Sequence, residues 1–197
     1  LNIAGIGIGG VGQHFIQSCV EAGQKIVALC DVDDQYAAKV FDEYPNAKRY
    51  KDYRQMLEKE KMDGEIIATP DHHHVLAATM ACNVGLDVYV EKPISHNLHE
   101  GRQIIAAAAK YNRIVQAGTQ QRSCPAVQEA AKDIQAGKYG KVQWVHCSKL
   151  GARTSIGKVT EPQPVPEHID YNLWAGPAPM SPVMRKSFHY DWHWQWN

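Results

Sequence analysis

Short apolar runs alternate with segments of helical periodicity over the first two thirds of the chain. The runs lie at residues 1–6, 25–29, 65–69, 87–90 and 114–117, and each is short and apolar, as a buried parallel strand is. Between them, the pattern predicts helices at residues 11–20, 35–43, 52–57, 70–81 and 97–111. This alternation predicts an α/β fold, a doubly wound parallel sheet with helices on both faces.

Capping and breaking residues support the predicted helix ends. Gly23 and Gly85 follow helical patterns and are natural helix stops. Pro70 suits the first turn of a helix, and Asp52 could cap a short one. Asn97, three residues before a glutamate, predicts a capping box.

The regular alternation ends near residue 118. One helix (126–136) and one strand (142–149) are predicted beyond it, and then six of the ten prolines crowd into residues 162–182. We therefore expect a first domain at residues 1–120 and a separate region at 121–197, with the boundary near 118–124. The second region is too short and irregular to bury a core alone, so we expect it to pack on the first domain or to lack partners.

Composition narrows the classes of function. Among 197 residues, 21 Lys and Arg balance 21 Asp and Glu, which argues against nucleic-acid and membrane-surface partners because both require a basic excess. The five cysteines are scattered without CxxC spacing, so we expect reduced thiols and no zinc site. The chain begins at Leu1 inside a strand-like run, which leaves the compartment open. Cytoplasm is the default expectation, and the periplasm is the alternative if a signal peptide has been removed.

A glycine-rich loop follows the first predicted strand and opens the first predicted helix. Gly7, Gly9 and Gly12 fit the GxGxxG pattern. The first glycine permits a tight turn, the second lets a pyrophosphate approach the backbone, and the third lets the helix pack close to the sheet. We expect the loop, including Gly10 and Val11, to bind the phosphates of a dinucleotide.

An aspartate at the end of the second predicted strand supports this interpretation. Asp31 lies 19 residues after Gly12, where a carboxylate can accept hydrogen bonds from the hydroxyls of the adenosine ribose. It would repel a 2′-phosphate, and residues 32–34 contain no arginine to neutralise one. The sequence therefore predicts an NAD site in preference to an NADP site. The alternative is that no cofactor binds here, and that the glycines form a structural turn beside a surface aspartate.

Two further motifs follow the third and fourth predicted strands. Three consecutive histidines, His72, His73 and His74, point in different directions from a helix and cannot bind one metal ion together, so we expect no metal here. We expect them to be polar residues at the start of a helix, with one of them facing the cofactor. Lys92 ends the next strand at the same edge, where a bound nicotinamide would lower its pKa and let it exchange a proton with a carbinol oxygen. A lysine at a strand end is more often simply solvated, and that alternative stays open.

Several segments together resemble the Gfo/Idh/MocA family, which includes glucose-fructose oxidoreductase and inositol dehydrogenase. The matching segments are, in order, GIGIGGVG, CDVD, ATPDHHHVLAATMACNVGLDVYVEKP, QAGTQQRS, AGKYGKV and NLWAGPAP. The resemblance implies a Rossmann domain followed by an α+β domain with an open, mostly antiparallel sheet. That second domain would supply the substrate face and assemble the protein as a homodimer or tetramer.

The resemblance also assigns roles to residues by motif. It places the glycine loop on the pyrophosphate and Asp31 on the ribose. It makes Lys92 both a cofactor contact at the nicotinamide and the catalytic lysine, with a cis bond to Pro93. The remaining cofactor contacts that it implies are Thr69, Pro70, His74, Glu91, Pro93 and Gln120. Arg122 is implied as a substrate contact.

The end of the chain departs from the family pattern. Family members continue into a glycine-rich segment with an Asp and a His that face the substrate, and the sequence ends at Asn197 before such a segment. We therefore expect the functional protein to be longer. Tryptophan occurs at every second position of residues 192–196, so an extended segment would place three indoles on one face. We expect these indoles to pack in a core in preference to contacting a ligand. His189 and His193 are further candidates for substrate contacts.

The sequence thus predicts an NAD-dependent oxidoreductase acting on a secondary alcohol of a sugar, glycoside or cyclic polyol. One alternative recycles NAD within the site, so that transient oxidation assists elimination or glycoside cleavage. Another is a non-catalytic, NAD-responsive binding or regulatory protein.

Overall fold

The computed structural model describes residues 1–148, 151 and 154–194, which belong to two compact units. The larger unit combines residues 1–118 with residues 158–197, and the smaller comprises residues 119–157. The Pro-rich region that follows the predicted boundary therefore belongs to the same unit as the predicted first domain.

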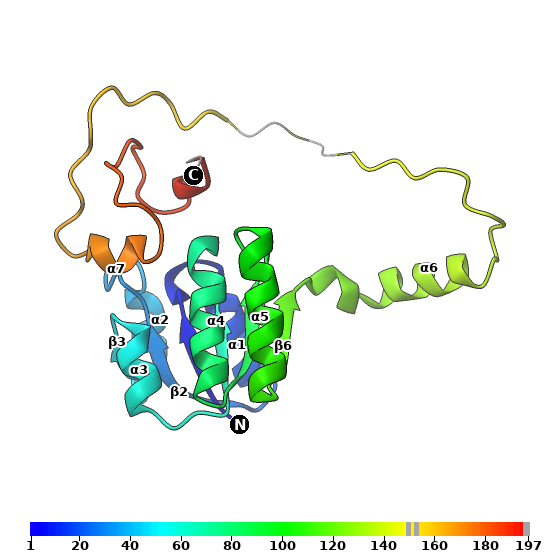
Figure 1. The fold of residues 1–197 in the computed structure, drawn as a ribbon, viewed down its shortest axis with the longest axis horizontal. Helices are drawn as coiled ribbons and strands as arrows, with labels where there is room; N and C mark the ends of the chain where they lie inside the picture. Colours follow the sequence, from blue (N-terminus) through cyan, green and yellow to red (C-terminus); the bar gives the residue numbers. More distant parts are fainter. Residues whose placement is uncertain (149–150, 152–153, 195–197) are drawn as a thin grey trace. The chain divides into compact units, whose positions relative to one another are not determined.

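A single six-stranded parallel sheet forms the centre of the larger unit (Figure 1). Its strands are β1 (Asn2–Ile6), β2 (Lys25–Cys30), β3 (Lys48–Tyr50), β4 (Gly64–Ile67), β5 (Asp87–Glu91) and β6 (Val115–Gly118). Their order is β3-β2-β1-β4-β5-β6, so the direction of winding reverses between β1 and β4. Ligands of such sheets bind where the strands end at this reversal.

Helices cover both faces of the sheet, as the sequence predicts. They are α1 (Gln13–Glu21), α2 (Ala38–Glu43), α3 (Tyr53–Lys59), α4 (His74–Asn83) and α5 (Leu98–Tyr111). Ile16 and Phe41 bring α1 and α2 into one hydrophobic cluster. Met56, Ala78 and Ile104 bring α3, α4 and α5 into a second cluster. The predicted doubly wound α/β fold is confirmed.

Side-chain caps fix two of these helices. The Asp52 carboxylate accepts a hydrogen bond from the Arg54 amide at 2.9 Å and caps α3. The Asn97 side chain accepts from the Glu100 amide at 3.0 Å and caps α5. The predicted capping box is only half formed, because the Glu100 carboxylate accepts from the His96 amide rather than from that of Asn97.

The smaller unit contains the turn η3 (Gln120–Ser123) and the predicted helix, α6 (Pro125–Gln135). The predicted strand at 142–149 is wrong for residues 142–148, which form no strand. A strand requires ladder hydrogen bonds to a neighbour, and no described segment pairs with this one. Residue 149 lies outside the described residues, and the predicted antiparallel sheet stays a prediction.

Residues 158–194 contain only α7 (Tyr171–Ala175) and the turn η4 (Asp191–Trp194), as the density of prolines predicts. Ile169, Trp174 and Ala175 form a small buried cluster here. The predicted extended alternation at 192–196 is wrong for the described residues 192–194, which lie in η4. This turn lets Trp192 pack against the small cluster, and residues 195–197 lie outside the described part.

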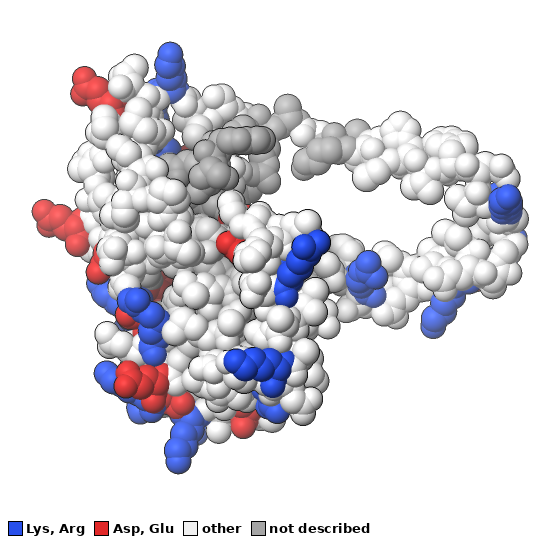
Figure 2. All heavy atoms as spheres, viewed as in Figure 1, with Lys and Arg blue, Asp and Glu red and all other residues white. Residues whose placement is uncertain are grey.

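Figure 2 shows positive and negative side chains close together on the visible face of the sheet-containing unit. Among the described residues, no helix is both long enough and apolar enough to span a bilayer.

Candidate functional site

The glycine loop connects β1 to α1 at the carboxyl edge of the sheet. Gly7 adopts a left-handed φ of 75°, and a Cβ there would lie 2.7 Å from the backbone of Thr69. A Cβ on Gly12 would lie 2.4 Å from the Gly7 carbonyl oxygen. Side chains are therefore excluded at both positions, and the loop passes close to the end of β4.

The Asp31 carboxylate lies directly against this loop. Its Oδ2 accepts a hydrogen bond from the Gly9 amide at 2.9 Å, and its Oδ1 accepts from the Asp33 amide at 3.1 Å. Burial raises the pKa of Asp31, and these two hydrogen bonds act in the opposite direction. Each oxygen keeps lone pairs that ribose hydroxyls could use.

His74 connects the loops that follow β4 and β5. Its Nδ1 lies 2.7 Å from the Pro93 carbonyl oxygen, and its Nε2 lies 2.9 Å from the Thr69 carbonyl oxygen. The ring is only 1% exposed. His74 therefore holds Thr69 and Pro70 at a fixed spacing from the segment that carries Lys92.

Lys92 is exposed where β5 ends. The Lys92–Pro93 bond is cis, which confirms that expectation from the sequence. The buried Glu91 carboxylate accepts a hydrogen bond from the Lys92 amide at 2.6 Å and so fixes the backbone at the base of the lysine side chain.

These features fit a dinucleotide. A glycine-rich cradle, a carboxylate at its border and an exposed lysine lie on one edge of the sheet. The Thr69 hydroxyl, in the residue next to the glycine loop, is buried without a hydrogen-bond partner among the described residues, which leaves a donor and an acceptor unused there.

The other two histidines of the cluster point to the Pro-rich region. The Nε2 atoms of His72 and His73 lie 3.1 Å and 2.8 Å from the Trp174 carbonyl oxygen. No group of three or more His, Cys, Asp or Glu side chains suited to a metal ion occurs in the part of the chain that the structure describes. His72 and His73 therefore hold α7 against the sheet edge.

We expect His73 to make the protein less stable in acid. Burial lowers its pKa to about 4 from the usual 6.5. The unfolded chain therefore binds a proton between these values that the folded protein does not, so stability falls as pH falls through this window, by roughly 3 kcal/mol in total. His73→Gln keeps an amide donor but does not titrate. The change in stability from about pH 7 to about pH 4.5, measured by urea unfolding, should be less favourable for the wild type than for the variant, and equal changes would contradict the assignment.

The remaining candidates lie in three different settings. His189 Nε2 lies 2.7 Å from Asp33 Oδ2, at the Asp31 end of the crevice. His193 lies in η4 and contacts the carbonyl of Tyr190, the residue before this turn. Gln120 and Arg122 belong to η3 of the smaller unit. The roles of these four residues stay predictions.

Sequence reasoning missed Asp33 and Tyr36. The Asp33 carboxylate is 2% exposed and accepts from the amides of Gln35 and Tyr36, each at 2.9 Å. The Tyr36 ring packs on Gly9, where a Cβ would lie 2.3 Å from it. The only signal in the sequence is that both residues follow Asp31 closely.

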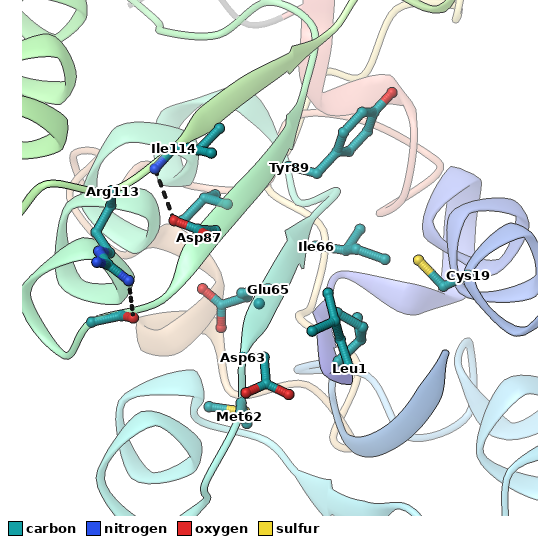
Figure 3. Close-up of a pocket in the computed structure, with 14 residues that line it drawn as sticks. Leu1, Cys19, Met62, Asp63, Glu65, Ile66, Asp87, Tyr89, Arg113 and Ile114 are labelled. Carbon is teal, nitrogen blue, oxygen red and sulfur yellow. Dashed lines mark hydrogen bonds between the residues drawn. The ribbon is translucent and has the colours of Figure 1, made fainter. Parts of the chain in front are cut away.

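A separate hollow of about 470 Å³ lies at the opposite edge of the sheet, where β1, β4 and β5 begin (Figure 3). Asp63, Asp87 and Arg113 contribute polar groups to its lining, and the buried Glu65 borders it. It is remote from the glycine loop, because the strands run in parallel from this edge to the other.

Comparisons with known proteins agree with this geometry. A sequence model described as an oxidoreductase family with an NAD-binding Rossmann fold (GFO_IDH_MocA) matches residues 1–119. The rhizopine catabolism protein MocA of Rhizobium meliloti is 30% identical over 143 residues, which cover 72% of this chain and 44% of that protein. Inositol 2-dehydrogenase 1 of Saccharopolyspora erythraea is 30% identical over 155 residues, which cover 75% and 45% respectively.

A solved structure shares the fold. Myo-inositol 2-dehydrogenase from Lactobacillus plantarum superposes with a TM-score of 0.68 at 28% identity, over 72% of this chain and 43% of that protein. The chain thus spans less than half the length of these relatives.

Proposed function

Because the chain belongs to the Gfo/Idh/MocA family of oxidoreductases, we propose that the protein oxidises a secondary alcohol of a cyclic polyol or sugar with NAD. The observation that carries the proposal is the Asp31 carboxylate, hydrogen-bonded to Gly9 of the glycine loop. The inositol dehydrogenases among the relatives support a cyclic polyol as the substrate class.

The residues of the crevice have distinct tasks in this proposal. Bound NAD would supply the hydride acceptor. Gly7, Gly9, Gly10, Val11 and Gly12 hold the pyrophosphate through backbone contacts, and Asp31 accepts hydrogen bonds from the ribose. Contacts along the nicotinamide half come from Thr69, Pro70, His74, Glu91, Pro93 and Gln120. This binding mainly supplies orientation.

In this proposal, Lys92 acts on the proton of the substrate hydroxyl. Its Nζ takes up or directs the proton of the substrate hydroxyl while the carbon loses hydride. Arg122 and His193 are proposed as substrate contacts. We further propose that residues 121–197 begin a second domain that completes the substrate face and joins the subunits of a homodimer or tetramer.

The test is NADH formation by the protein with NAD and a panel of inositols, sugars and glycosides. An increase in NADH absorbance with a cyclic polyol is expected. If NAD binds but no alcohol yields NADH, the dehydrogenase proposal is wrong, and analysis of the same samples for an altered sugar would then detect chemistry with internal recycling of NAD.

Asp31→Ser should weaken NAD binding about 10- to 100-fold, because hydrogen bonds to a charged acceptor contribute roughly 1.5–3 kcal/mol each. Binding of NADP should weaken less or improve, because the repulsion of its 2′-phosphate is removed. Calorimetric titration with both cofactors measures the change in preference. Asp34→Ser is the matched control, since Asp34 pairs with Lys51 at 2.8 Å on the surface. An equal loss for both cofactors would contradict a role for Asp31 in discrimination.

A further inference from the structure

We infer that residues 158–194 form a working part of the cofactor site, in which His189 positions Asp31 through Asp33 and so couples docking of this segment to NAD binding. The inference rests on the proposed use of NAD. It concerns a segment that lies beyond the residues matched by the family model.

The segment docks on the loops that surround the crevice. Ile169 forms an antiparallel bridge with Asp33 after β2, and the His168 carbonyl accepts from Lys51 Nζ at 3.3 Å after β3. The Trp174 carbonyl lies within hydrogen-bond distance of His72 and His73 after β4. All of these contacts lie at the carboxyl edge of the sheet, where the ligand would bind.

His189 is the contact nearest to the cofactor loop. Its Nε2 lies 2.7 Å from Asp33 Oδ2, while the Asp33 amide donates to Asp31 Oδ1. Asp31 Oδ2 in turn accepts from the Gly9 amide. Hydrogen bonds of 2.7 to 3.1 Å therefore link the docked segment to the glycine loop by way of Asp33 and Asp31.

A second link runs through an aromatic pair. The rings of His189 and Tyr36 stack at 3.9 Å with an angle of 11° between their planes. Tyr36 also packs directly on Gly9, and its hydroxyl would lie 3.4 Å from a Cβ on Gly10. His189 thus holds both the carboxylate and the aromatic ring that border the adenosine end of the loop.

The Asp33 carboxylate makes the positions of Asp31 and Tyr36 depend on the docking of residues 158–194. This buried carboxylate lies 2.7 Å from His189 and 3.3 Å from the Nε2 of His168, both on the segment. Undocking would remove both partners and leave the Asp33 carboxylate held only by the amides of Gln35 and Tyr36, next to the like charge of Asp31. By thermodynamic linkage, a ligand that requires Asp31 in place stabilises the docked segment to the same extent as the segment strengthens binding of the ligand.

The experiment measures NAD affinity by calorimetry and backbone protection by hydrogen–deuterium exchange. In the wild type, NAD should slow exchange in peptides covering residues 165–176 and 185–190. His189→Leu removes both links and should raise the Kd for NAD about tenfold, within the usual range for coupled sites, and abolish the protection. His189→Gln keeps a donor but loses the stack, so it should recover part of the affinity. His99→Asn, on the exposed face of α5, is the control and should match the wild type.

The outcomes separate the two proposals. If the wild type binds NAD but NAD leaves exchange in the segment unchanged, or if His189→Leu binds NAD as tightly as the wild type, the coupling is wrong and the proposed function stands. If the wild type binds no NAD, both proposals fail. A circular dichroism melt shows whether each variant is folded, and Asp33→Asn, which interrupts the same chain from the other side, should reproduce the loss if His189→Leu does not fold.

Discussion

Replacing Lys92 with alanine is expected to lower kcat roughly 1000-fold, within the 10²- to 10⁴-fold range typical of proton transfer by a side chain. The Kd for NAD should change less than about threefold, because in this mechanism the lysine acts on the hydroxyl and the backbone of the loop is fixed by the Glu91 carboxylate. Steady-state kinetics with the polyol identified in the panel, together with calorimetric titration of NAD, measure the two quantities separately.

A second substitution distinguishes proton transfer from electrostatic guidance. Lys92→Arg keeps the positive charge but cannot lose its proton at neutral pH. If Lys92 transfers the proton, the arginine variant should be within about tenfold of the alanine variant. Activity close to that of the wild type would show that only the charge is needed. Lys39→Ala, in an exposed pair with Glu43 on α2, should leave both kcat and NAD affinity unchanged.

The sequence predicted the parts of the molecule whose signals are local. Buried strands are apolar runs, so five of the six strands were found, whereas β3 is the short polar segment Lys48–Tyr50 and gave no such signal. The glycine loop and Asp31 were found because a turn and the end of a strand are each encoded within a few residues. The strand predicted at 142–149 is wrong for residues 142–148, because an alternating pattern shows only that a segment could form a strand, and a strand also needs a partner.

The rest of the site depends on contacts between distant residues. His189 and Asp33 are 156 positions apart in the sequence, and only the docking of residues 158–194 brings them together. His72 and His73 were expected at a polar helix start, but their contact with the Trp174 carbonyl depends on the same docking. Periodicity carries no information about which surface an irregular, proline-rich segment covers.

Glu65 is another residue whose environment the sequence did not reveal. Its position in β4 was predicted, but the sequence does not show that helices would enclose the carboxyl group. The side chain is 2% exposed, and neither carboxyl oxygen has a hydrogen-bond partner among the described residues. Burial raises its pKa from 4.5 to about 8.

We expect this carboxyl group to make the protein less stable in mildly alkaline solution. Between pH 4.5 and about 8, the folded protein holds a proton that the unfolded chain has released. Stability therefore falls as pH rises through this window, by roughly 1.4 kcal/mol per unit and on the order of 5 kcal/mol in total. His73 acts in the opposite direction at lower pH, because its folded pKa is depressed. The two windows overlap between pH 4.5 and 6.5, where the opposite slopes nearly cancel, so together these two groups favour maximal stability within that overlap.

Glu65→Gln tests the first of these effects, because the amide has nearly the same shape and does not titrate. Urea unfolding at about pH 6.5 and about pH 9, above the window of His73, should show a decline of roughly 2 kcal/mol for the wild type and little for the variant. Glu58→Gln, on the exposed side of α3, should retain the wild-type decline. A variant with the same pH slope as the wild type would show that the Glu65 carboxyl is solvated or paired in solution. Combining Glu65→Gln with His73→Gln should flatten both limbs of the profile, since neither side chain shifts the pKa of the other and their effects should add.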